Sequence, residues 1–497
     1  MARFLLYCRR MRSYVRALAV LSATFVLPAC PDRTVAKLPP QQQGASLKKI
    51  PVSEDIDVLF VIDNSASTLD KQTVFEQNFP AFATALNNFP SGEPNLHIAV
   101  VDSTVDIGVT GFGPSCPSPD PADNGLFQNQ PKIAGCSPPS GQFISDIKNA
   151  DGSRTKNYTG TLDQALSCIA LLGANGCGFE TQLEAMKRAL DGTNPQNSGF
   201  IRNGAYLAVI FLTDEDDASV KDKTVYTLMD SQVGGRNDFR VQPLFAYNCD
   251  KPISASMGDT YSNCTPRTDS YLQDPAFYSQ FLSTVKDPGE TVVAVIAGPP
   301  PGLTTNDMPP QMGTSMTSIM TGSLTINGNV QPMALEPSCS ATINGNPAIG
   351  RPAVRLASFL SAYGEHGKFY TVCQSDYSAA LTDIGNTLFN AISPCLEGPI
   401  DTTDQDANNP GTQLQCTVQD VQNIDTPSEH DSPIPPCKMS SPNTVDASSA
   451  IPCFWTDQNT TSCPSPDTGY EINIDRGSSP PAPGTVVEVE CAITTQM

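Results

Sequence analysis

Short runs of almost unbroken apolar residues constrain the fold of this chain more than any other feature. The main ones are VLFVI (58–62), LHIAVVD (96–102), AYLAVIFLTD (205–214), ETVVAVIAG (290–298) and KFYTVC (368–373). Stretches with helical spacing of apolar residues alternate with them, at 71–89, 178–190, 274–286, 353–364 and 377–392. Strands that are apolar on both faces and alternate with helices indicate a parallel sheet covered on both sides. We therefore expect a doubly wound, mostly parallel α/β domain over residues 51–395, with long loop insertions.

The N-terminus has the pattern of an export signal. Four arginines between residues 9 and 16 precede the apolar run ALAVLSATFV and a site of small residues, which is typical of a cleaved signal peptide. Whether translation starts at Met1 or at Met11 stays open. No other run approaches the roughly 20 apolar residues of a membrane-spanning helix.

The signal ends in LPAC, residues 27–30, which resembles the lipobox of bacterial lipoproteins. In that family the cysteine becomes the lipidated first residue of the mature protein. We therefore expect a lipoprotein-type signal peptide over 1–29, lipidation at Cys30 and a flexible tether over 30–50, which is polar and contains proline. The alternative is an ordinary secreted protein.

The C-terminal part differs in composition. Residues 396–497 lack helical periodicity and contain five cysteines, the only tryptophan and two alternating runs, GYEINIDR and TVVEVECAI. Such a segment is typical of a small disulfide-rich β domain.

Cysteine usage agrees with export. After Cys8 in the signal and Cys30 are set aside, an even number remains, which indicates disulfides. The disulfide candidates are Cys116, Cys136, Cys168, Cys177, Cys249, Cys264, Cys339, Cys373, Cys395, Cys416, Cys437, Cys453, Cys463 and Cys491. Sequence does not fix connectivity, but neighbours suggest local loops, which would be 116 with 136, 168 with 177, and 249 with 264. A cysteine–histidine metal site is disfavoured because there is no CxxC pair and the three histidines are far apart.

Oxygen-bearing side chains follow two of the expected strands. Asp63, Ser65 and Ser67 come directly after the strand at 58–62, and Asp214 ends the strand at 205–214. The carboxyl ends of parallel strands meet at one edge of the sheet, so these side chains should lie together. A hard divalent cation would neutralise the two carboxylates. The sequence thus predicts a site for Mg²⁺, Ca²⁺ or Mn²⁺.

These residues also carry a family resemblance. DNSAS at 63–67 matches the DxSxS motif of von Willebrand factor type A (VWA) domains, and FLTDEDD resembles the later strand of that family, which ends in Thr-Asp. The resemblance spans about residues 55–395. It implies a Rossmann-like VWA fold with a metal-ion-dependent adhesion site (MIDAS), in which the metal keeps one position open for a carboxylate of a protein partner.

The third metal-binding segment departs from the family pattern. The family supplies a threonine before its middle helix, where this chain has NGCGFETQLEA. The resemblance places Glu180 at that position and Thr181 one step away, so either is a candidate ligand. A structural role is the alternative for both, with Thr181 as a helix cap and Glu180 as a first-turn acid.

Further acids lie close in sequence but are expected to have other roles. Glu215, Asp216 and Asp217 follow Asp214 and should be solvated loop acids. Two acids after the second strand, at 102 and 106, are expected to form turns.

Function follows from these features as an expectation. The net charge of −22 argues against nucleic acid as a partner. We expect an exported, lipid-anchored binding protein of the bacterial cell envelope, at the periplasmic face of the outer membrane or the cell surface. Its VWA-like domain would use a divalent cation for adhesion or protein–protein assembly. An envelope scaffold with a structural metal is the alternative. A metal-dependent hydrolase is less favoured, because the chain has neither GxSxG nor HExxH, and we expect no enzyme.

Overall fold

The fold is taken from a computed structural model. It describes residues 45–51, 55–89, 93–106, 124–131, 134–149, 151–225, 246–252, 260–300, 319–326, 329–396, 398–422, 428–460, 463, 469–477 and 485–494. The predicted signal peptide, the start at Met1 or Met11, Cys30 and Cys116 lie outside these residues. No helix in the described part of the chain is long and apolar enough to cross a membrane.

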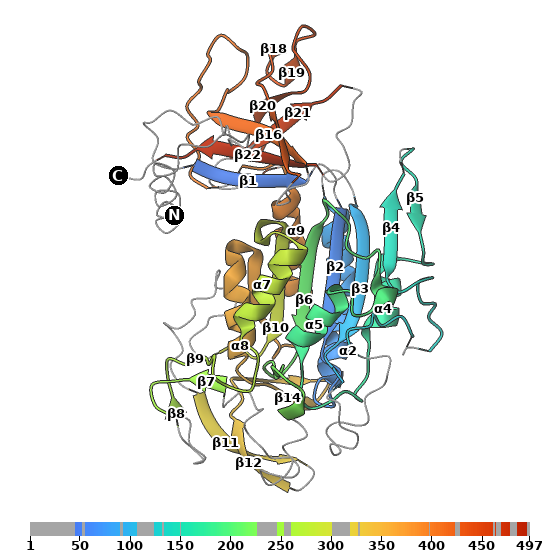
Figure 1. The fold of residues 1–497 in the computed structure, drawn as a ribbon. Coiled ribbons are helices and arrows are strands. Elements are labelled where there is room, and N and C mark those ends of the chain that lie inside the picture. The colour runs from blue at the N-terminus through green and yellow to red at the C-terminus, as the bar shows by residue number, and fades with distance from the viewer. Residues whose placement is uncertain are drawn as a thin grey trace, which may run out of the picture. The chain divides into compact units, whose positions relative to one another are not determined.

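A seven-stranded sheet organises the α/β domain. Its strands are β2 (Asp55–Ile62), β3 (Asn95–Asp102), β4 (Ile144–Lys148), β5 (Arg154–Lys156), β6 (Tyr206–Leu212), β10 (Thr291–Ala297) and β15 (Gly367–Thr371). Their order is β15-β10-β6-β2-β3-β4-β5 (Figure 1). The pairs from β15 to β3 are parallel, whereas β4 and β5 extend the edge antiparallel. The expected mostly parallel sheet is confirmed, and the antiparallel edge is an addition to it.

Helices cover both faces of this sheet. One face carries α2 (Leu69–Gln77), α3 (Phe79–Asn87), α4 (Leu162–Ala170) and α9 (Ser378–Ile392), and the other carries α5 (Gln182–Leu190), α7 (Pro275–Val285) and α8 (Val354–Leu360). Alternate residues of β2 enter the two cores: Val58 and Phe60 pack on the first side, Leu59 and Val61 on the second. This alternation is why the strand is apolar throughout.

Local sequence sets several helix ends. The periodic stretch 71–89 is divided at Asn78, and Pro80 occupies the first turn of α3, where its missing N–H costs nothing. Asp274 begins α7 by accepting a hydrogen bond from the Ala276 N–H at 3.0 Å.

The insertions contain short strands and turns. They are η1 (Pro195–Asn197), β7 (Tyr247–Asn248), β8 (Thr260–Tyr261), β9 (Thr265–Pro266), η4 (Pro288–Glu290), β11 (Ile319–Ile326), β12 (Asn329–Leu335), β13 (Cys339–Ile343), β14 (Asn346–Gly350) and η5 (Ser361–His366). The pairs β11–β12 and β13–β14 are antiparallel hairpins.

The C-terminal part is a β structure, as the sequence predicts. Its strands are β16 (Cys416–Gln422), β17 (His430–Ile434), β18 (Met439–Ser441), β19 (Thr444–Val445), β20 (Cys453–Gln458), β21 (Tyr470–Asp475) and β22 (Val486–Ala492). A further strand, β1 (Ala45–Pro51), comes from the other end of the chain and pairs with β22 in the antiparallel sheet β1-β22-β16-β17. Residues 45–50, which the sequence assigns to the tether, therefore belong to this sheet. Ile50 explains the difference, because it is buried in the C-terminal core.

Six disulfides join described residues. The pairs are 136–168, 249–264, 339–373, 395–463, 416–491 and 437–453. Cys177 is disulfide-bonded as well. The suggested pair 249–264 is confirmed. The suggestions 116–136 and 168–177 are wrong, because α4 places Cys168 beside Cys136 instead of its neighbour in sequence.

Candidate functional site

The predicted acids lie side by side at the carboxyl edge of the sheet. Ile62 and Leu212 are partners in the parallel register of β2 and β6, and the Asp63 N–H donates to the Leu212 carbonyl at 2.9 Å. Asp63 directly follows β2, and Asp214 follows β6 by two residues. Their side chains are 0% and 2% exposed, respectively. The edge therefore buries two carboxylates from adjacent strands, as the sequence predicts.

Neutral donors hold the Asp63 carboxylate. The Ser65 N–H donates to Oδ1 at 2.8 Å and the Thr213 hydroxyl to Oδ2 at 2.7 Å. The Thr68 hydroxyl donates to the Asp63 carbonyl at 2.8 Å, which fixes the turn that follows the strand. No cation is among these partners.

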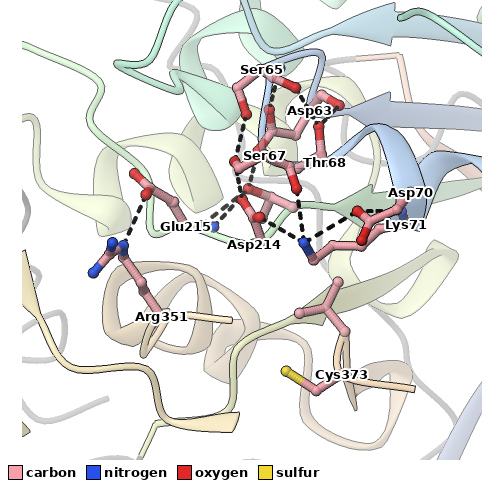
Figure 2. Close-up of polar contacts among 12 residues, drawn as sticks. Asp63, Ser65, Ser67, Thr68, Asp70, Lys71, Asp214, Glu215, Arg351 and Cys373 are labelled. Carbon is pink, nitrogen blue, oxygen red and sulfur yellow. Dashed lines mark hydrogen bonds and ion pairs between the residues drawn. The ribbon is translucent and has the colours of Figure 1, made fainter. Parts of the chain in front are cut away.

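The two serine hydroxyls connect Asp63 to Asp214. Ser65 Oγ lies 3.2 Å from Ser67 Oγ, and Ser67 Oγ donates to Asp214 Oδ1 at 3.0 Å (Figure 2). Oxygens that share one octahedral Mg²⁺ lie about 3 Å apart, since the metal–oxygen distance is about 2.1 Å. The spacing of these oxygens thus suits common ligands of one hard cation.

A lysine that the sequence did not single out reaches the same carboxylate. Lys71, in the first turn of α2, is 2% exposed. Its Nζ lies 2.9 Å from Asp214 Oδ2 and donates to the Ser67 carbonyl at 2.8 Å (Figure 2). Lysines are rarely buried without a charged partner, and Asp214 is that partner here.

The structure separates the roles of Glu180 and Thr181. The Thr181 hydroxyl donates to the Ser103 carbonyl at 2.8 Å, and its N–H donates to the same oxygen. Glu180 is 3% exposed, and its carboxyl experiences the negative charges of Glu215, Asp63 and Asp214. Of the two alternatives, Glu180 is the one whose side chain belongs to the acidic cluster, while Thr181 ties α5 to the loop after β3.

The acids of this cluster hold their protons more tightly than free carboxyls. Burial, followed by the charges of Glu215 and Asp63, raises the pKa of Glu180 well above its ordinary value. Burial also raises the pKa of Asp63. Burial and the charge of Asp63 raise the pKa of Asp214 to about 7, although Lys71 acts in the opposite direction. The positive charge in the cluster is therefore too small to balance the carboxylates.

Gly176, which precedes α5, and Gln182, the first residue of α5, support the turn after β2 and its neighbours. The Gly176 N–H donates to the Asn64 carbonyl at 2.7 Å, and a Cβ at Gly176 would overlap Asn64. The Gln182 amide donates to Thr213 Oγ1 at 2.8 Å and so supports the hydroxyl that holds Asp63. Neither role could be read from spacing, because both depend on contacts across the sheet edge.

The prediction of solvated loop acids after Asp214 is wrong for two of the three. Asp216 is buried and accepts from the Arg355 and Leu356 N–H groups in the first turn of α8. Asp217 is buried and accepts from the N–H of residue 183 in α5 at 3.1 Å. Both carboxylates satisfy helix N-termini, which attract negative charge.

The remaining acids behave as expected or have local partners. Glu215 is partly exposed and pairs with Arg351 at 2.9 Å. Asp102 accepts from the Thr104 N–H at 3.1 Å, which is the turn expected after β3. Asp106 lies 3.6 Å from the ammonium of a surface lysine, in an exposed ion pair.

A cavity of about 250 Å³ lies next to Thr181. Its lining includes four basic side chains, Lys187, Arg188, Lys221 and Lys223, and two acidic ones, Asp106 and Glu184, together with Phe277, which is 40% exposed. Two of the basic groups are paired within the cavity, because Arg188 contacts Glu184 and Lys223 contacts Asp106.

Among the described residues, no three histidine, cysteine, aspartate or glutamate side chains form a metal-binding group by themselves. A cation at this edge would therefore need the serine hydroxyls and water in addition to carboxylates. Hydroxyl, carboxylate and water oxygens are the donors that Mg²⁺, Ca²⁺ and Mn²⁺ take. The donor set fits such a cation.

Comparison with known proteins gives no family. No family model matches the chain, and no curated protein matches it. The pilus adhesin SpaC from Lactobacillus rhamnosus GG, in its open conformation, is 14% identical with a TM-score of 0.31, over 90% of this chain and 40% of that one. The human COPII-coat protein Sec24c is 8% identical with a TM-score of 0.29, over 94% and 48%.

The pilus adhesin RrgA from Streptococcus pneumoniae is 8% identical with a TM-score of 0.24, over 90% of this chain and 57% of that one. This chain thus spans 40% to 57% of the length of the three structures. At TM-scores below 0.5 these similarities carry no conclusion about fold or function. The site is interpreted from its own geometry.

Proposed function

We propose that this chain is an exported binding protein whose α/β domain is of the VWA type and uses a divalent cation at the Asp63–Asp214 edge. The DxSxS spacing, the doubly covered parallel sheet and the convergence of the two strand ends support this proposal. Binding of a protein partner, in adhesion or in assembly at the cell envelope, is the role that such a site serves best.

One observation carries the proposal, and it is a charge imbalance. Asp63, Glu180 and Asp214 are each at least 97% buried, and Lys71 is the buried cation that contacts this group in the described structure. Were the three carboxylates ionised, they and the one ammonium would leave two negative charges in a medium of low polarity, and this cost agrees with the raised pKa values of all three acids. A divalent cation would cancel that excess.

Asp63, Ser65, Ser67 and Asp214 would hold the cation, and the carboxylate of Glu180 would add negative charge beside it. When bound, the cation supplies an electrophilic position at the surface for a carboxylate of a partner. Ser67 is the exposed member of the group, so the partner would approach on its side. The hydroxyls are neutral ligands and would add no further negative charge to the site.

The partner proposed here is a protein with acidic side chains. The cavity beside Thr181 has four basic and two acidic side chains in its lining, and this excess of positive charge would suit acidic residues that flank a metal-bound carboxylate. Phe277 adds exposed aromatic area, which is common in binding surfaces.

Export is supported by the disulfides, because six crosslinks among the described residues persist only in an oxidising compartment. Lipid anchoring at Cys30 remains our proposal from the LPAC sequence.

Calorimetric titration of Mg²⁺, Ca²⁺ and Mn²⁺ into the purified protein tests the cation site. We expect binding by the wild type and at least tenfold weaker binding by Asp63→Asn and Asp214→Asn, because each removes a buried charge from the cluster. Asp146→Asn is the matched control: Asp146 is also fully buried, but Arg154 and Lys156 already neutralise it at 2.6 and 3.0 Å. Its affinity should equal that of the wild type.

Absence of cation binding by the folded wild type would contradict the proposal. A second readout separates partner binding from a purely structural metal. Envelope proteins that the wild type retains with Mg²⁺ should be lost both with a chelator and in Asp63→Asn. If the same envelope proteins are retained with the chelator and by Asp63→Asn, while the melting temperature depends on the cation, the metal is structural and the scaffold role is favoured.

A further inference from the structure

The ammonium group of Lys71 is buried next to the proposed divalent-cation site. Its Nζ contacts Asp214 Oδ2 at 2.9 Å and the Ser67 carbonyl at 2.8 Å, and lies 3.5 Å from Asp70 Oδ1. Figure 2 shows these contacts converging on the ammonium. Two of the partners, Ser67 and Asp214, are also among the proposed cation ligands.

The two oxygens of the Asp214 carboxylate have different partners. Oδ1 accepts from the Ser67 hydroxyl at 3.0 Å, and Oδ2 faces Lys71. With Oδ2 engaged by the ammonium, Oδ1 is the oxygen that accepts from the Ser67 hydroxyl. The carboxylate is thereby held in one orientation, and bidentate coordination of a cation through both oxygens is blocked.

We propose that Lys71 is a built-in counter-cation that sets the affinity and the coordination of the divalent site. This inference rests on the function proposed above. Lys71 contributes one of the positive charges that the buried carboxylates require, so a bound cation meets a smaller negative charge and a fixed, monodentate Asp214. The lysine acts through Asp214 and is a positioning residue, not a ligand.

The direction of the effect follows from Coulomb's law. Ser67 Oγ and Lys71 Nζ contact the two oxygens of the same carboxylate, so a cation bound at Ser67 would lie within about 5–7 Å of the ammonium. A doubly charged and a singly charged cation at that distance repel each other strongly even at an effective dielectric constant of about 20. Removing the ammonium should therefore strengthen cation binding by at least tenfold.

A purely structural lysine would behave differently. Its loss would lower stability equally with and without a cation and would not change cation affinity. Charge and hydrogen bonding can be separated, since Lys71→Gln keeps a donor that can reach the Ser67 carbonyl while Lys71→Met removes both. Lys156→Gln is the matched control, because Lys156 also pairs with a buried aspartate, Asp146, at 3.0 Å.

The test is calorimetric titration of Mg²⁺ and Ca²⁺ into the wild type and the three variants, with melting temperatures measured with and without cation. Lys71→Gln and Lys71→Met should both bind at least tenfold more tightly than the wild type. Without cation both should melt at a lower temperature, and saturating cation should restore most of that loss. Lys156→Gln should keep the wild-type affinity, and its loss of stability should not respond to cation.

The outcomes are distinguishable. Wild-type binding with unchanged affinity in both Lys71 variants overturns this inference and leaves the proposed function standing. Binding by none of the proteins overturns both. Tighter binding in Lys71→Met alone also contradicts a charge effect, because the glutamine removes the same charge. If Lys71→Met does not fold without cation, the glutamine variant and folding of the methionine variant in saturating Ca²⁺ still decide the question.

Discussion

The buried aspartates at the two ends of β2 have different hydrogen-bond partners. Near its start, Asp57 is fully buried, and Arg202 donates to both carboxylate oxygens at 2.7 Å, from its N–H and from Nε. Asp63, after the end of the strand, has only neutral donors. The guanidinium of Arg202 supplies a positive charge for Asp57, whereas a carboxylate without a cationic partner could accept a bound cation. This contrast agrees with the cation site proposed at the carboxyl edge.

Asp57 gives a prediction about pH. Burial raises the pKa of its carboxyl to about 6, although Arg202 lowers it. The folded state therefore keeps a proton that the unfolded chain, with an aspartate pKa near 4, has lost. Stability from this group is fully present below pH 4 and falls by about 3 kcal/mol as the pH rises through 6. We expect the unfolding free energy of the wild type, relative to Asp57→Asn, to fall by that amount from pH 4 to pH 7.

Urea unfolding of both proteins at several pH values between 4 and 7 measures this difference. His97, whose nearest ring nitrogen lies 3.8 Å from Asp57 Oδ1, is present in both proteins, so most of its own titration cancels. If the unfolding free energy of the wild type instead rises with pH relative to that of Asp57→Asn, the attraction of Arg202 outweighs the cost of burial. A difference independent of pH would show that the two effects cancel.

At the scale of elements, the loop after β6 joins three helices. Asp216 accepts from the first turn of α8, Asp217 from the first turn of α5, and the Arg355 side chain in α8 donates to the Asp217 carbonyl and to the carbonyl of Gln273 just before α7. Asp214 begins this loop. The position of the candidate site thus depends on ion pairs and caps on the far side of the same segment.

Loss of Arg355 should therefore destabilise the domain strongly. Its side chain is 0% exposed and lies 3.1 Å from Asp217 Oδ2, so Arg355→Met leaves a buried carboxylate with no cation. Breaking a buried pair on one side typically costs about 3–5 kcal/mol, which urea unfolding would show as a lower midpoint. Arg267→Met is the comparison, since the pair of Arg267 with Asp269 is exposed to solvent. A midpoint for Arg355→Met as close to wild type as that of Arg267→Met would refute this account of the loop.

Elements with a long, regular apolar pattern could be predicted from sequence. The strands around Phe60, Ile210 and Val295 are buried on both faces, and their composition shows it. The helix α4, which lies between loop-rich segments, is not among the helical stretches that the apolar periodicity predicts. Its signal was Thr161 followed three positions later by Gln164, whose side chain accepts from the Thr161 N–H at 3.2 Å.

The candidate site was predictable where the chain continues a strand, as at Asp63 and Asp214. It was not predictable where a distant element decides the environment. Asp216 is a helix cap because α8 begins about 140 residues later in the chain, and Lys71 is buried because Asp214 faces it. Motif spacing identifies the candidate ligands that directly follow the strands. Whether an acid or a lysine is buried depends on which distant elements pack against it.

At the scale of the whole molecule, both ends of the described chain share one sheet. β1 pairs with β22 along seven residue pairs, from Ala45 opposite Ala492 to Pro51 opposite Val486.

This topology predicts that β22 needs β1 as a covering strand. Replacing residues 45–51 with glycine and serine of the same length removes the buried side chain of Ile50 and weakens seven residue pairs without changing the reach of the chain. The same replacement at residues 34–40 is the control. We expect amide exchange in β22 to become at least tenfold faster in the first variant, with a greater tendency to associate, because an uncovered edge strand can pair with other chains.

Hydrogen exchange read by mass spectrometry measures both proteins against the wild type. Equal protection of β22 in all three would show that β16 and the disulfide between Cys416 and Cys491 hold the strand by themselves, and that β1 contributes no stability.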